Sequence, residues 1–125
     1  MRRQSIVLWA LVLLIGGSGV LHFVSPGFYR RIVPRVVGHP DQVVALSGAA
    51  ELVCAAAMAF PRTRRVGGWL TAALLVAVFP ANFQMALDGG VPGAGFPMGN
   101  PVVAWLRLPL QVPLVMMAVS VARSR

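Results

Sequence analysis

Several polar side chains stand inside long apolar runs, where they are able to do chemistry. Glu51 lies within LSGAAELVCAAAMAF, residues 46–60, and is one of only three acidic residues in the chain. Another apolar run contains Arg107 and, four residues later, Gln111, while His22 closes the first run. A buried acid, base and imidazole can hold an anion, polarise a carbonyl group or move a proton. What they do depends on the solvent around them and on the elements that position them.

The composition is that of a membrane protein. Hydrophobic residues make up 58% of the chain and charged residues only 11%, whereas a soluble domain carries about 25% charged residues. With so few charged residues, the chain cannot cover a water-exposed surface with polar groups. The net charge of +8 does not indicate nucleic-acid binding. The arginines form short clusters at the ends of apolar runs, which is typical of membrane boundaries, and aromatic residues do not alternate with them.

Four apolar runs are long enough to cross a bilayer, because a hydrocarbon core of about 30 Å needs about 20 helical residues. We therefore predict an all-α fold, a four-helix transmembrane bundle that forms a single membrane domain over residues 1–125. Residues 26–40 are too short and too charged to span, and they predict a short amphipathic interfacial segment after the first span, interrupted at Pro34. The predicted spans cover about residues 5–24, 41–60, 66–87 and 101–121.

The first run is interpreted as a span and not as a cleaved signal peptide. It stays apolar as far as Val24, and its removal would leave an odd number of spans. The chain uses arginine and no lysine and is rich in Ala, Gly, Val and Pro, a composition typical of GC-rich bacterial genomes. We therefore expect a multi-pass protein of the bacterial cytoplasmic (inner) membrane.

The placement of arginine predicts the orientation. More arginines flank the side that carries both chain ends and the loop 61–65 than the opposite side, where Asp41 and Asp88 partly offset the basic residues. The positive-inside rule then places both termini in the cytoplasm. The first group is Arg2, Arg3, Arg62, Arg64, Arg65, Arg123 and Arg125, and the second is Arg30, Arg31 and Arg35.

The polar residues of the four runs fall in the outer half of the membrane or near its midplane. At a rise of about 1.5 Å per residue, Glu51 and Gln111 lie about 15 Å deep, Arg107 about 9 Å and Asn82 about 8 Å, with His22 near the outer end. A charged residue at the bilayer centre costs about 2.5–3.5 kcal/mol. We therefore predict an ion pair between Glu51 and Arg107 inside the bundle, direct or bridged by Asn82, Gln111 or water.

One face of the second span carries Glu51 together with other candidate residues. Ser47, Glu51, Cys54 and Met58 share a helical stripe. Prolines at 80, 109 and 113 interrupt the third and fourth helices and free backbone carbonyls, which Asn82 and Gln111 are placed to satisfy. A single cysteine excludes an internal disulfide, and no metal site or catalytic residue is predicted. The candidate ligand-binding or polar-core residues are His22, Ser47, Glu51, Asn82, Arg107 and Gln111.

The order of these motifs resembles a known family. GVLHFVSPGFYRRIVP, LSGAAELVCA, PRTRR, LLVAVFPANFQMAL and LRLPLQ follow one another along nearly the whole chain. Together they resemble the DoxX-like family of small four-helix membrane proteins, named after a membrane subunit of an archaeal thiosulfate:quinone oxidoreductase. The resemblance implies a left-handed four-helix bundle. It also implies a membrane partner or accessory subunit of an oxidoreductase or oxidative-stress system, with a quinone as the cofactor it favours.

Two other classes of function stay open at this stage. An outward-facing polar cleft suits a binder or transporter of a small lipophilic or anionic molecule. Alternatively, the polar cluster fixes helix register, and the protein is a membrane scaffold with a structural polar core. The sequence assigns no enzymatic reaction and leaves open whether the chain forms a homo-oligomer.

Overall fold

The computed structural model describes residues 2–31, 33, 37–90, 96 and 99–123. Every regular element in this part of the chain is a helix, which confirms the predicted all-α fold. The helices are α1 (Arg2–Val24), α2 (Pro26–Arg30), α3 (Pro40–Ala59), α4 (Arg64–Ala77), α5 (Phe79–Leu87) and α6 (Pro101–Arg123).

Four helical stretches are long and apolar enough to cross a membrane: α1, α3, α4 together with α5, and α6. Large apolar side chains are exposed along them, among them Leu13, Leu46 and Leu106. Apolar surface of this extent is stable against lipid chains and not against water. The protein is therefore a multi-pass membrane protein whose helices contact the bilayer.

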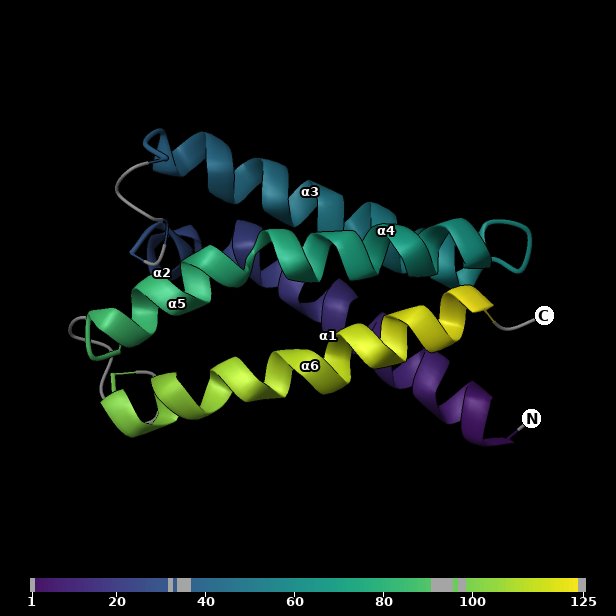
Figure 1. Ribbon diagram of the computed structural model, residues 1–125. Coiled ribbons are helices and arrows are strands. Elements are labelled where there is room, and N and C mark those ends of the chain that lie inside the picture. The colour runs from purple at the N-terminus through teal and green to yellow at the C-terminus, as the bar shows by residue number, and fades with distance from the viewer. Residues whose placement is uncertain (1, 32, 34–36, 91–95, 97–98, 124–125) are drawn as a thin grey trace.

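The spans alternate in direction (Figure 1). Both chain ends and the turn between α3 and α4 lie at one end of the bundle, which we call the termini end. The short helix α2 and the end of α5 lie at the other, which we call the α2 end. α1 packs along α3, α3 on α4, and α4 on α6, while α6 also contacts α1. α5 makes its extensive contacts with α6.

Prolines shape the last two spans in different ways. The third span breaks at Val78, because Pro80 has no N–H and is tolerated only in the first turn of the new helix α5. α6 runs unbroken with Pro109 and Pro113 inside it, so the prediction that these two prolines interrupt the fourth helix was wrong. The φ angle of proline is itself helical, and neighbouring groups in a bundle can satisfy the carbonyls it leaves.

Glycines bring the helices into close contact at two crossings. A Cβ added to Gly48 of α3 would lie 2.7 Å from the Cβ of His22 on α1. A Cβ added to Gly68 of α4 would lie 2.5 Å from the backbone nitrogen of Ala122 on α6. Small residues allow such backbone approach between membrane helices. The apolar core around these crossings comprises Leu8, Leu11, Ile15, Cys54, Ala55, Met58, Ala72, Leu75, Ala118 and Val121.

The segment after the first span is only partly helical. α2 covers five residues, and Arg30 at its end forms an exposed ion pair with Asp41 at the start of α3, with 2.8 Å between Nη1 and Oδ1. Pro34, at which the predicted interfacial segment is interrupted, lies outside the described residues, as does Arg35. The helix α2 therefore closes back onto α3 and caps this end of the α1–α3 pair.

Arginine side chains hydrogen-bond backbone carbonyls at the termini end. Arg64 donates from Nε to the carbonyl of Met58 at 2.8 Å and from Nη2 to that of Ala59 at 3.0 Å. Arg65 donates from Nε to the carbonyl of Ala122 at 3.3 Å. Carbonyls in the last turn of a helix have no partner within it, so these two side chains satisfy the ends of α3 and α6.

Candidate functional site

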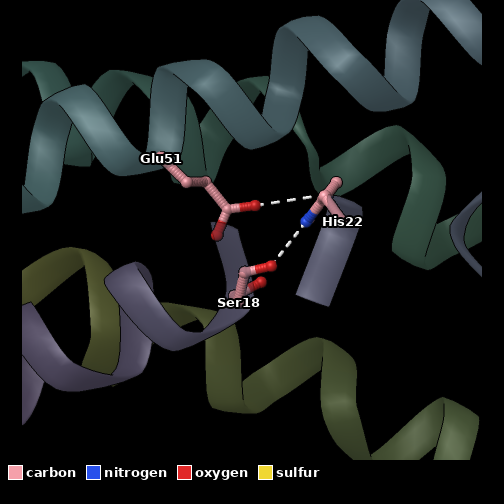
Figure 2. A network of polar contacts seen from close by, with 3 residues as sticks. All are labelled: Ser18, His22 and Glu51. Carbon is pink, nitrogen blue, oxygen red and sulfur yellow. Dashed lines mark hydrogen bonds and ion pairs between the residues drawn. The ribbon is translucent and has the colours of Figure 1, made fainter. Parts of the chain in front are cut away.

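The centre of the site is an acid–imidazole pair between α1 and α3. The Nε2 atom of His22 lies 3.3 Å from Oε1 of Glu51, and both residues are buried (Figure 2). His22 reaches Glu51 because Gly48, one turn before Glu51, lets α1 approach α3 closely. Two of the predicted site residues are thereby brought into direct contact.

The hydrogen bonds of the ring fix where its protons lie. Nδ1 of His22 is 2.7 Å from the backbone carbonyl oxygen of Ser18, one turn earlier on α1. A carbonyl only accepts, so Nδ1 carries a hydrogen and donates it. Nε2 on the opposite side of the ring therefore faces the Glu51 carboxyl, at the ion-pair distance given above.

Tyr29 and Arg107 extend this pair toward the α2 end. The ring of Tyr29 on α2 stacks on the His22 imidazole, with centroids 3.8 Å apart and planes inclined by 20°. Arg107 of α6 interacts electrostatically with Tyr29 and points Nη1 toward Sδ of Met85 at 3.7 Å. Side chains from α1, α2, α3 and α6 are thus linked in one series.

A direct ion pair between Glu51 and Arg107, one of the two forms predicted, does not occur among the described residues. Glu51 pairs with His22 and not with Arg107. The reason is the packing order of the helices: α3 lies along α1, whereas α6 packs against α1, α4 and α5. His22 and Tyr29, which stack on one another, lie on the side of Glu51 toward the α2 end.

A second polar contact supports the break in the third span. Nε2 of Gln111 donates to the backbone carbonyl of Leu75 at 2.7 Å, and Nδ2 of Asn82 donates to Oε1 of Gln111 at 3.4 Å. Leu75 belongs to the last turn of α4, where carbonyls lack helical partners. Of the two residues predicted to satisfy carbonyls freed by prolines, Gln111 bonds a carbonyl one residue before the one that Pro80 frees, and Asn82 bonds the Gln111 side chain and not the backbone.

The predicted stripe on the second span faces the bundle. Glu51, Cys54 and Met58 are buried on α3, and Ser47 is half-buried. No hydrogen bond among the described residues involves the Ser47 side chain. Cys54 interacts with both Glu51 and Thr71 of α4. Within the described part of the chain, no group of three or more His, Cys, Asp and Glu residues is placed to hold a metal ion.

Comparison with known proteins gives a family and no activity. Residues 11–122 match a family described as a domain of unknown function, DUF8561. The chain belongs to the DUF8561 family. No curated protein and no solved structure matches it. The family description does not name the DoxX-like proteins, so that resemblance, together with the redox role it implies, stays a prediction.

Two residues of this DUF8561 site were not among the predicted ones. Ser18 stands four residues before His22, a helical spacing that allows its carbonyl to bond the ring. Tyr29 is the only tyrosine in the chain and was noted only within the family-like motif. Its stacking depends on how α2 folds back after Val24, which the spacing of residues does not determine.

Proposed function

We propose that this DUF8561 protein is a membrane-embedded accessory subunit or partner of an oxidoreductase, and that it docks a quinone-class molecule beside His22, Tyr29 and Arg107. The proposal places the protein in the bacterial cytoplasmic membrane with both termini in the cytoplasm, as the arginine distribution predicts. Its main support is the buried contact between His22 and Glu51, which places two groups able to carry a proton side by side inside the bundle.

The residues present fit the needs of a quinone headgroup. A bound quinone would offer carbonyl acceptors and take up two electrons and two protons, with the electrons supplied by the partner oxidoreductase. The Arg107 guanidinium is a donor able to polarise a carbonyl, and the Tyr29 ring gives an aromatic face near it. His22 and Glu51 would pass the two protons to the headgroup one at a time, each replaced from water at the α2 end, while Nδ1 of His22 stays on the Ser18 carbonyl.

The test is to identify what survives purification in mild detergent. We expect quinone, detected by mass spectrometry of the extract, to accompany the wild-type chain and to be largely lost from Glu51→Gln and Arg107→Gln. Val53→Ala, a change to an exposed residue on α3, is the matched control and should retain quinone. A wild-type chain that carries neither quinone nor an oxidoreductase, while still folded, would refute the proposal.

A second candidate is a scaffold whose polar groups serve packing alone. It is favoured by the completeness of the hydrogen bonding: every buried side-chain nitrogen and oxygen in the described residues has a partner. In a scaffold, Glu51→Gln keeps a hydrogen-bonding group at the α1–α3 crossing and should preserve function as well as fold. Loss of a stress-resistance phenotype in a folded Glu51→Gln protein would therefore exclude this candidate.

A further inference from the structure

At the termini end, a group of arginines has no acidic side chains beside it. Arg3, Arg62, Arg65 and Arg123 are exposed there, and Arg64 is half-buried against the end of α3. None of the three acidic side chains of the chain lies at this end, since Asp41 begins α3, Glu51 lies mid-span and Asp88 follows α5. A cationic surface of this kind attracts an anionic partner.

Two of these arginines, Arg65 and Arg123, belong to the crossing of α4 and α6. Nε of Arg65 is bonded to the carbonyl of Ala122, and Arg123 is the next residue of α6. The contact holds the Arg65 guanidinium in place, and no hydrogen bond among the described residues uses its two terminal nitrogens. Guanidinium groups bind phosphate oxygens with two parallel hydrogen bonds.

Exposed apolar side chains continue directly below this cationic surface. Val66 is 59% exposed and Trp69 is 51% exposed, and Arg65 and Trp69 are four residues apart on one face of α4. Phe60, just before the turn, is 66% exposed. A partner that covers both surfaces must combine an anionic group with hydrocarbon chains, which nucleic acids and free anions do not.

We propose that the crossing of α4 and α6 at the termini end is a binding site for anionic phospholipid. The phosphate lies against Arg65 and Arg123, Arg62 adds charge at the rim, and the acyl chains run along Val66 and Trp69. A lipid held in this way joins the start of α4 to the end of α6, beside the close contact of Gly68 with Ala122. This site is independent of the quinone proposal, because it lies at the opposite end of the bundle from Tyr29.

The test is native mass spectrometry of the full chain in mild detergent, with phosphatidylglycerol and phosphatidylcholine added in equal amounts. We expect phosphatidylglycerol to bind preferentially, and each of Arg65→Gln and Arg123→Gln to reduce that preference about fivefold. Arg30→Gln, which removes an exposed arginine at the α2 end, is the control and should leave the preference unchanged.

Three outcomes would overturn the site: no preference between the lipids, an equal effect of Arg30→Gln, or full displacement of the lipid by inorganic phosphate alone. The last would identify a site for soluble anions. Arg65→Gln also loses the bond to Ala122 and is expected to be less stable, so Arg123→Gln decides the outcome if Arg65→Gln does not fold.

Discussion

A buried imidazole and a buried carboxyl meet where α1 packs on α3. Nδ1 of His22 donates to the Ser18 carbonyl, so Nε2 faces the Glu51 carboxyl at 3.3 Å. An isolated ionised carboxyl in this interior is costly, so the adjacent ring is the natural partner for it. The stack of Tyr29 on the ring further limits its movement.

Removing one partner of this pair is therefore expected to lower the free energy of unfolding more than replacing the acid by its amide. His22→Leu leaves the Glu51 carboxyl without its ring partner and should lower the free energy of unfolding by about 1–2 kcal/mol. Glu51→Gln keeps a donor facing Nε2 and should cost clearly less. Thermal unfolding in detergent measures both, with Val53→Ala as the control. Equal losses would mean that the amide does not replace the acid as a partner of the ring.

The sequence can indicate that polar residues inside the spans need polar neighbours, but not which neighbours they find. In the structure His22 contacts Glu51, and Asn82 contacts Gln111. The partner of Glu51 depends on which helices pack closest. That choice follows from the complementary shapes of α1 and α3 around Gly48, which no single run of residues reveals.

At the scale of elements, close helix crossings and one helix break define the bundle. The spans themselves were predictable, because their number and length follow from apolar runs long enough for the bilayer. The effect of each proline on its helix was not predictable from the sequence. Pro80 begins a new helix, whereas Pro109 and Pro113 lie inside an unbroken one. Whether a proline ends a helix depends on tertiary contacts such as that of Gln111 with Leu75.

The crossing of α4 and α6 should not tolerate even a methyl group. Gly68→Ala places a Cβ 2.5 Å from the backbone nitrogen of Ala122, so one helix must move, and we expect a loss of about 1–3 kcal/mol from overpacking. Gly17→Ala meets nothing within 4 Å and should be neutral or stabilising by up to about 1 kcal/mol. Unfolding of the two variants in detergent compares them, and similar stabilities would contradict the tight crossing.

The contact of Gln111 with the end of α4 is expected to contribute measurably to stability. Gln111→Met fills a similar volume but leaves the Leu75 carbonyl without its donor, and should cost about 0.6–1.7 kcal/mol. Leu110→Met, at the exposed neighbouring position, is the control and should change little. If both variants unfold together with the wild type, the carbonyl has found another donor.

At the scale of the whole molecule, the distribution of arginine residues is linked to the alternating direction of the spans. The antiparallel spans bring both chain ends and the 60–63 turn to one end of the bundle, and most arginines lie there. This arrangement is what the positive-inside rule needs to orient a short multi-pass chain.

The orientation can be tested by labelling single cysteines in a Cys54→Ala background. Arg62→Cys and Asp88→Cys lie at exposed positions at opposite ends of the bundle. A membrane-impermeant maleimide added to intact spheroplasts should label Asp88→Cys and spare Arg62→Cys until the membrane is opened. The reverse pattern would place both termini outside.

The break at Val78 has a consequence for motion. α5 is joined to α4 only through this residue and is held mainly by α6, whereas α1, α3 and α4 share the apolar core. Segments with fewer buried contacts open locally before the rest of a protein. Backbone amides of α5 should therefore take up deuterium sooner than those of α3, so that α5 opens locally while the pair of α1 and α3 stays closed.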